Sequence, residues 1–120
     1  MIPLDGGSAR ATPNVLLCGA QTVGAVQTIT TRGAVSLNTL VTVLNSSGGV
    51  QALTLAAGVA GQVKIITMGT AGNASTMTVS NGNLAGMSTS IVWDAVGEGV
   101  TLLYNGAKWV VVGQFGVTIS

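Results

Sequence analysis

Asp94 and Glu98 are the pair of residues in this sequence that comes closest to a catalytic arrangement. Two carboxyl groups can flank a glycosidic bond, one as general acid and the other as base or nucleophile. Here they stand in the run D-A-V-G-E-G. Glycine-marked runs of this kind form turns in which an aspartate commonly caps its own backbone. We therefore interpret the pair as part of a turn.

Other reactive groups are scarce. The sequence has no histidine, which excludes histidine-activated nucleophiles and histidine-based metal sites. Cys18 is the single cysteine, and its expected role is that of a small buried apolar residue. No glycine-rich run has the form of a phosphate-binding loop. We expect no catalytic, cofactor-binding or metal site, and a protein that is not an enzyme.

The composition points to assembly. Charged residues make up 6% of the 120 residues, whereas soluble domains usually contain about 25%. Charge keeps the surface of a free monomer hydrated, so a chain this poor in it is expected to form a permanent homo-oligomer. The net charge of +1 and the lack of a basic run argue against nucleic acid as a partner. No long stretch is apolar enough for a spanning helix and the N-terminus does not resemble a secretory signal, so we expect no membrane partner and a cytosolic origin.

The elements that must position any site are organised around the stretch Ser90–Gly113, which holds both tryptophans and the single tyrosine. Within it, Asn105-Gly106 separates two apolar runs. Asn-Gly in this setting is the strongest short-range signal for a β-hairpin, because both residues tolerate the positive φ of a type I′ turn. The pattern predicts that Val100–Tyr104 and Lys108–Val112 are paired antiparallel strands.

The loop length decides which residues face each other across this hairpin. A two-residue loop places Tyr104 opposite Ala107 and Leu102 opposite Trp109. A four-residue loop places Tyr104 opposite Trp109 and Leu102 opposite Val111. With either loop the same residues share a face, since side chains alternate along a strand.

One face of the hairpin is expected to supply anchors for the core or for an oligomer contact. The anchors on the hairpin are Leu102, Tyr104, Trp109 and Val111, and Trp93 of the preceding strand is expected to join them. The second face carries Leu103, Val110 and Val112 beside Lys108, which is too apolar for a face fully exposed to water. We therefore expect a partner to cover part of it.

The rest of the chain also has the pattern of short strands separated by turn residues. Expected strands are Thr22–Thr31, Val35–Leu44, Val50–Leu55, Val63–Met68, Thr76–Ser80, Ser90–Trp93 and Val117–Ile119. This pattern predicts an all-β domain over residues 22–120, a compact sandwich, jelly roll or barrel of about eight short antiparallel strands. Strand spacing is near 8–12 residues without a true repeat, so a solenoid is possible but unsupported.

Two details of this pattern bear on the core. Val35, Leu37, Val41 and Val43 share one face of their strand, and Thr42 lies on the other. Met77 and Val79 are expected to point inward.

Residues 1–21 form an expected N-terminal arm. Its two prolines and Gly6-Gly7 favour extended backbone, and no helical period is visible. The residues of this arm that are expected to dock on another surface are Ile2, Leu4, Arg10, Val15, Leu16 and Leu17. A frayed tail followed by a first short strand is the alternative.

The C-terminal half resembles structural proteins of tailed bacteriophages. The segment A-G-V-A-G-Q-V-K-I-I-T-M, followed by N-L-A-G-M-S-T-S-I-V-W-D-A-V-G-E-G-V-T-L-L-Y-N-G-A-K-W-V-V-V-G, is similar to parts of capsid decoration (cement) proteins and of head or tail fibres. The resemblance covers roughly residues 50–117. It implies a non-enzymatic virion component, usually trimeric, whose partners are further copies of itself and the major capsid protein. The implied location is the capsid surface of a virion made in the host cytoplasm.

Size and pattern favour a decoration protein that binds the capsid exterior as a homotrimer, because neither heptads nor long repeats of a fibre shaft are visible. The alternative is a fibre tip or receptor-binding knob. A third reading is a carbohydrate-cleaving or carbohydrate-binding β-domain that uses Trp93, Tyr104 and Trp109 with Asp94 and Glu98. Tryptophans more often serve as hydrophobic anchors, which disfavours this reading.

Overall fold

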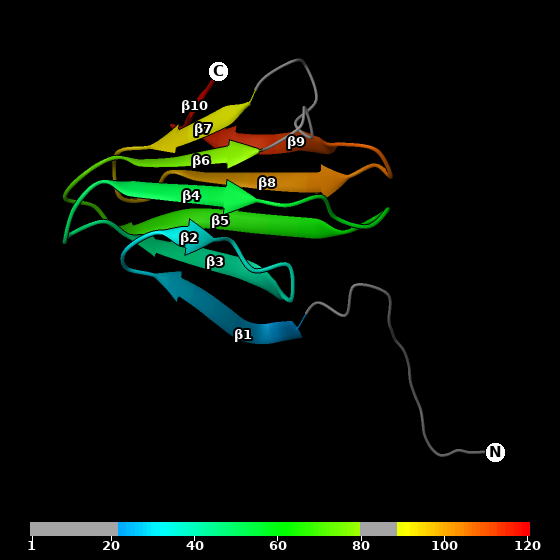
Figure 1. The fold of residues 1–120 in the computed structure, drawn as a ribbon, viewed down its shortest axis with the longest axis horizontal. Coiled ribbons are helices and arrows are strands. Elements are labelled where there is room, and N and C mark those ends of the chain that lie inside the picture. The colour runs from blue at the N-terminus through cyan, green and yellow to red at the C-terminus, as the bar shows by residue number, and fades with distance from the viewer. Residues whose placement is uncertain (1–21, 80–88) are drawn as a thin grey trace.

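Two five-stranded β-sheets lie one over the other with the hydrophobic core between them (Figure 1). The computed structural model describes residues 22–79 and 89–120, and within these ranges it contains no helix. Sheet A has the strand order β1-β3-β5-β8-β9, and sheet B has the order β10-β7-β6-β4-β2. The strands are β1 (Thr22–Ile29), β2 (Gly33–Ala34), β3 (Thr39–Asn45), β4 (Gln51–Leu55), β5 (Val63–Thr70), β6 (Ser75–Val79), β7 (Ser90–Trp93), β8 (Gly99–Tyr104), β9 (Trp109–Phe115) and β10 (Thr118–Ile119).

The first six strands alternate between the two sheets. The chain passes from β1 in sheet A to β2 in sheet B and returns to sheet A for β3. It repeats this course once through β4 to β5, and then crosses to sheet B for β6. Neighbours within a sheet therefore run in the same direction, so that β1, β3 and β5 are parallel, as are β2, β4 and β6. Each pair of strands, β1–β2, β3–β4 and β5–β6, makes one coil of the chain, and three such coils stack side by side.

After β6 the chain reverses. Strands β7 and β8 run antiparallel to β6 and β5, and β9 and β10 run antiparallel to β8 and β7. The all-β, two-sheet architecture is thus confirmed, but the expectation of about eight antiparallel strands is wrong. There are ten strands in the described ranges, and four of the eight strand pairings are parallel. Turn residues mark where a strand ends, but they do not say whether the chain returns beside that strand or crosses to the other sheet.

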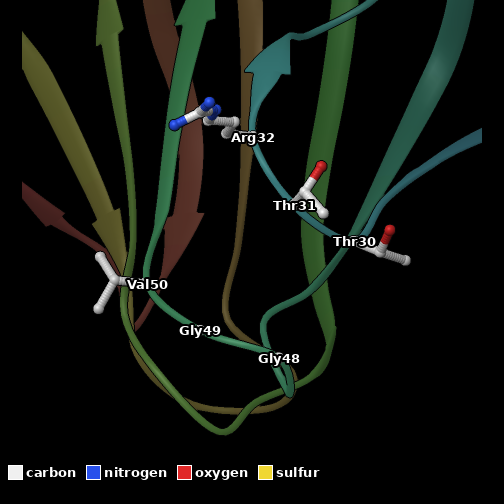
Figure 2. A pocket seen from close by; sticks show the side chains of 6 residues that line it. All are labelled: Thr30, Thr31, Arg32, Gly48, Gly49 and Val50. Carbon is white, nitrogen blue, oxygen red and sulfur yellow. The ribbon is translucent and has the colours of Figure 1, made fainter.

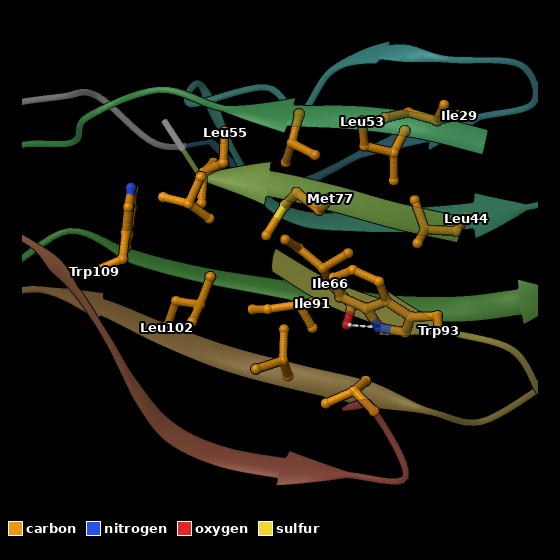
Figure 3. Packing of buried hydrophobic residues seen from close by; sticks show 14 of the residues in the cluster. Ile29, Leu44, Leu53, Leu55, Ile66, Met77, Ile91, Trp93, Leu102 and Trp109 are labelled. Atoms are coloured by element: carbon orange, nitrogen blue, oxygen red, sulfur yellow. Dashed lines mark hydrogen bonds between the residues drawn. The ribbon is translucent and has the colours of Figure 1, made fainter. Parts of the chain in front are cut away.

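Alternation of side chains builds the core between the sheets. In β4, Gln51, Leu53 and Leu55 are buried while the intervening residues are exposed. Met77 and Val79 of β6 point inward as predicted. Figure 3 shows how the apolar side chains of both sheets interdigitate, with Trp93 and Trp109 towards opposite ends of the layer. Tight packing of this kind makes the loss of a large side chain costly.

The C-terminal hairpin has the four-residue loop of the two alternatives. Tyr104 pairs with Trp109 and Leu102 with Val111. The side chain of Asn105 closes the loop, because its Oδ1 accepts hydrogen bonds from the backbone N–H groups of Ala107 and Lys108, both at 2.9 Å. The type I′ two-residue turn is therefore not formed, although Gly106 does have a positive φ of 99°.

Buried polar side chains join the three coils where the chain crosses between the sheets. The Gln51 side chain is fully buried and donates from Nε2 to the carbonyl oxygens of Ile29 at 3.0 Å and Asn45 at 2.9 Å. Its Oε1 accepts from the Ser75 hydroxyl at 2.6 Å. The Ser46 hydroxyl donates to the carbonyl of Asn73 in the same region. One amide thus connects residues of all three coils.

Candidate functional site

The outer face of sheet A is the largest uncharged surface that the register defines. Its residues form three rows across the strands, and we call them the outer face: Val63, Leu103 and Val110; Val26, Val41, Ile65, Thr101 and Gly113; Thr28, Val43, Thr67, Gly99 and Phe115. Each is half-buried or exposed, whereas the residues that alternate with them on β3, β5 and β8 are buried. None of the thirteen is charged.

On β3 and β5, a polar side chain of each strand faces inward while aliphatic side chains face outward. This is the reverse of what a β-sandwich with no partner on its outer face requires. Thr42 and Lys64 point into the molecule, while Val41, Val43 and Ile65 point outward. Thr42 is satisfied inside because its hydroxyl donates to Gln27 Oε1 at 2.8 Å. The valines that the sequence pattern grouped with Val35 are therefore on the outer face, although Val35 itself is buried.

A hollow of about 380 Å³ lies on this outer face over β5, β8 and β9. Gly99 and Gly113, which have no side chain, contribute to its lining together with Ile65, Thr67 and Thr101. A Cβ at Gly113 would meet no atom within 4 Å. Phe115, the single phenylalanine of the sequence, also lines the hollow and is 73% exposed.

A second hollow, of about 510 Å³, lies between two turns at the end of the coils (Figure 2). Thr30, Thr31 and Arg32 line it from the turn before β2, and Gly48, Gly49 and Val50 line it from the turn before β4. Arg32 is exposed, as are both threonines. The hollow combines a guanidinium group with hydroxyl groups, which suits contact with carboxylate or amide groups of a partner.

Lys64 is a buried cation near the opposite end of the coils. Its side chain has no exposed surface, and Nζ donates to the backbone oxygen of Thr39 at 2.8 Å and to its hydroxyl at 3.0 Å. Burial disfavours the charged form and lowers the pKa of Lys64 from 10.5 to about 8. Lys64 lies on the face opposite Val63 and Ile65, as alternation along the strand Val63–Met68 requires, and this face is the inner one.

This burial predicts a pH-dependent stability. Below pH 8, Lys64 is charged in both the folded and the unfolded state, so the cost of burying its charge fully lowers the free energy of unfolding. Between about pH 8 and 10.5 the unfolded chain holds the proton and the folded chain does not, so the free energy of unfolding should rise with pH, by at most about 1.4 kcal/mol per pH unit. Denaturant titrations from pH 7 to 10 measure this slope.

Two variants separate Lys64 from the other groups that titrate at alkaline pH. Lys64→Met should flatten the slope, and Lys108→Met, which removes an exposed lysine, is the matched control. Equal slopes in the wild type and Lys64→Met would show that the amine is not desolvated in solution.

Asp94 and Glu98 lie in a turn, as expected, but the side chain that caps the turn is that of Glu98 and not that of Asp94. Glu98 Oε1 accepts from the backbone N–H groups of Asp94 at 2.6 Å and Ala95 at 3.2 Å. The hydrogen bond from the Asp94 N–H lowers the pKa of Glu98. A side-chain hydrogen bond and the negative charge of Glu98 raise the pKa of Asp94. Glu98 thus caps the turn, and its position next to Gly116 leaves no room for a Cβ there.

The predicted anchor residues all lie at the core. Trp93, Leu102, Tyr104 and Trp109 are buried, and Val111 is half-buried and packs against them. Both tryptophans have no exposed surface, so neither offers a face on which a sugar ring could stack. The predicted docking residues Ile2, Leu4, Arg10, Val15, Leu16 and Leu17 lie outside the described residues, as does the rest of the 1–21 arm.

Three further observations concern metal sites, membrane spans and similarity to known proteins. In ranges 22–79 and 89–120 there is no group of three or more His, Cys, Asp or Glu side chains that could hold a metal ion. The same ranges contain no helix of the length and hydropathy needed to span a bilayer. No protein-family model matches the chain, and no curated protein matches it significantly.

Proposed function

We propose that this protein is a non-enzymatic structural component of a tailed-phage particle, a decoration protein that binds the capsid exterior as a homotrimer and stabilises the shell. The observation that carries an assembly role is the uncharged outer face of sheet A, with valines and an isoleucine outside and a lysine and threonine inside. The phage context comes from the resemblance of the C-terminal half to such proteins.

The stabilising mechanism is mass action. A protein that binds the assembled shell and not its dissociated subunits lowers the free energy of the shell by its binding free energy. A trimer that contacts several capsid subunits gains further from avidity, because the second and third contacts form at high effective concentration. Low affinity at each contact then suffices for stable decoration.

Two surfaces are candidates for the capsid contact. One is the 1–21 arm, whose apolar residues would add a strand or fill a groove on the major capsid protein. The other is the turn hollow beside Arg32, which also lies next to Gly48 and Gly49. The residues that line the turn hollow are distinct from those of the outer face, so a capsid contact at this hollow is compatible with self-association through sheet A.

A fibre tip or receptor-binding knob is the second candidate, and one observation favours it. The three parallel coils have the chain course of β-solenoids, which build elongated structures by stacking such units. The short coil stack and the reversal after β6 argue for a compact module, which suits a decoration protein as well as a tip.

Mixing the purified protein with emptied or expanded phage capsids tests the proposal. We expect stoichiometric binding in co-sedimentation and a higher disassembly temperature of the decorated shells. Binding to intact host cells, with none to capsids, would contradict the decoration role and favour the fibre tip.

A further inference from the structure

The outer face of sheet A has the residue types of an interior. Aliphatic side chains occupy its centre in three neighbouring strands, with Val41 beside Ile65 and Val63 beside Leu103. Burial of such side chains is worth about 25 cal/mol per Å² of apolar area, and here that area remains half-exposed. The polar side chains on this face are threonines, while Thr42 of β3 and Lys64 of β5 point inward.

The dimensions of the face suit the centre of a protein interface. Strands lie about 4.8 Å apart and residues on one face repeat about every 6.7 Å, so each position covers about 32 Å² and the thirteen residues of the outer face cover roughly 400 Å². That is at the size where apolar patches on monomers are often functional. A standard interface needs about 800 Å² per partner, with an apolar centre and a more polar rim.

Phe115 and the glycine hollow give this face both a protrusion and a cavity. Phe115 stands at the end of the edge strand β9 and is 73% exposed. The hollow beside it, with Gly99 and Gly113 in its lining, holds about 380 Å³. An exposed aromatic ring that fills a pocket on the partner is a frequent centre of binding energy in interfaces.

We infer that the outer face of sheet A is the contact between copies of this chain, with Phe115 of one copy seated in the hollow beside Gly99 and Gly113 of another. This inference deepens the proposed self-association and rests on it. It names the surface and the anchor side chain of the oligomer.

Charge and shape identify a second copy as the occupant. The face carries no charged side chain, so nucleic acid, an anionic surface or a strongly charged protein would lose solvation there without gaining an ion pair. A second copy presents an equally uncharged face, so no charged group has to give up its hydration when the two faces meet. It also supplies the aromatic side chain that the hollow accepts, from the same strand that borders the hollow.

The edges of the two sheets agree with this assignment. Sheet B ends on both sides in strands of two residues, β2 and β10, which blunts its edges. Sheet A ends in β1 and β9, of eight and seven residues, and neither contains a charged residue. Long uncharged edges are an aggregation hazard unless an assembly covers them. A contact centred on Phe115 places β9 inside the interface.

Filling the hollow is the first test. Gly113→Leu adds a side chain where a Cβ meets open space, so the fold should tolerate it while Phe115 of the other copy is excluded. Gly48→Leu is the matched control, because a Cβ there also meets nothing within 4 Å, and the residue is exposed in the turn between β3 and β4 and does not line this hollow. Light scattering after size exclusion, from 1 to about 100 µM protein, measures the mass.

We expect the wild type and Gly48→Leu to be oligomers at micromolar concentration, and the dissociation constant of Gly113→Leu to rise at least tenfold. Phe115→Ala, which shortens an exposed side chain, should show the same rise with an unchanged melting temperature of the monomer. If Gly113→Leu does not fold, Phe115→Ala decides the question.

The inference is overturned if the wild type is a monomer at about 100 µM, or if Gly113→Leu and Phe115→Ala associate as tightly as the wild type. These outcomes are distinct from failure of the capsid role. An oligomer that is disrupted by both variants but does not bind capsids would support the surface assignment and contradict the decoration function. A dimer in place of a trimer would support the surface and contradict the proposed stoichiometry.

Discussion

Replacing Trp109 with alanine is expected to lower the free energy of unfolding by about 3–5 kcal/mol. The indole has no exposed surface and Nε1 donates to the carbonyl of Ala56 at 2.8 Å. Its ring packs edge-on against Tyr104, with ring centroids 5.1 Å apart at an interplanar angle of 76°. Gly58 lies so close that a Cβ there would be 2.8 Å from the indole. The loss approaches the whole stability of a small domain.

Urea titration followed by circular dichroism measures this effect, and failure of the variant to express in soluble form is the extreme outcome. Trp109→Phe keeps most of the apolar contact and loses the indole hydrogen bond, so its cost should be clearly smaller. Val112→Ala, at an exposed position of the same strand, is the matched control and should change stability by less than about 0.5 kcal/mol. A Trp109→Ala variant as stable as Val112→Ala would contradict the core assignment.

Replacing Gln51 with leucine is expected to cost about 2–4 kcal/mol, because it removes three hydrogen bonds made by a fully buried amide. The Ile29 and Asn45 carbonyls lose their donor, and the Ser75 hydroxyl loses its acceptor. Leucine has a similar volume, so the loss is one of hydrogen bonding rather than of packing. The change should also loosen the first coil, since the Ile29 carbonyl is its contact with this amide.

A double-mutant cycle with Ser75→Ala checks the cause of this loss. Ser75→Ala removes the hydroxyl that Gln51→Leu leaves unpaired, so the double variant should be less destabilised than the sum of the two single variants. Strict additivity of the two changes in unfolding free energy would mean that the Gln51–Ser75 hydrogen bond contributes nothing.

Local chemistry explains which parts of the fold were predictable from the sequence. The Asn105-Gly106 pair and its flanking strands located the hairpin, and alternation assigned Leu102 and Trp109 to one face whatever the loop length. Both assignments rest on neighbours in the chain. The loop length itself depended on Asn105 Oδ1 accepting from Ala107 and Lys108, which the sequence pattern left open.

The course of the chain between the sheets was not predictable from these signals. Gly33 pairs with Leu53 and Leu53 pairs with Met77, so successive coils advance the chain by 20 and then 24 residues. Unequal coils leave no fixed period in the sequence, even though the strands stack regularly. The buried amide of Gln51, which connects the coils, has no local sequence signature, because its partners in the other two coils are 22 and 24 residues away along the chain.

Which side of β3 faces outward was not predictable for a related reason. A strand with valines on one side and threonine on the other is expected to turn its valines inward, and β3 does the opposite at Val41 and Thr42. The inward position of Thr42 depends on Gln27 of the neighbouring strand, and that of Lys64 depends on Thr39. Tertiary hydrogen bonds of this kind turn the polar side of a strand inward, while its side chains still alternate between the two faces.

The stack of parallel coils makes the molecule modular along one axis. Each coil contacts only its neighbours in the stack, so its contribution to stability is a local sum of its own packing and the interfaces with those neighbours. Gain or loss of one coil alters the length of the stack by a single strand spacing, about 4.8 Å. The terminal hairpin and its tryptophan do not need to change for this to happen. Descendants of this chain can therefore differ in length by whole coils while keeping the same closed end.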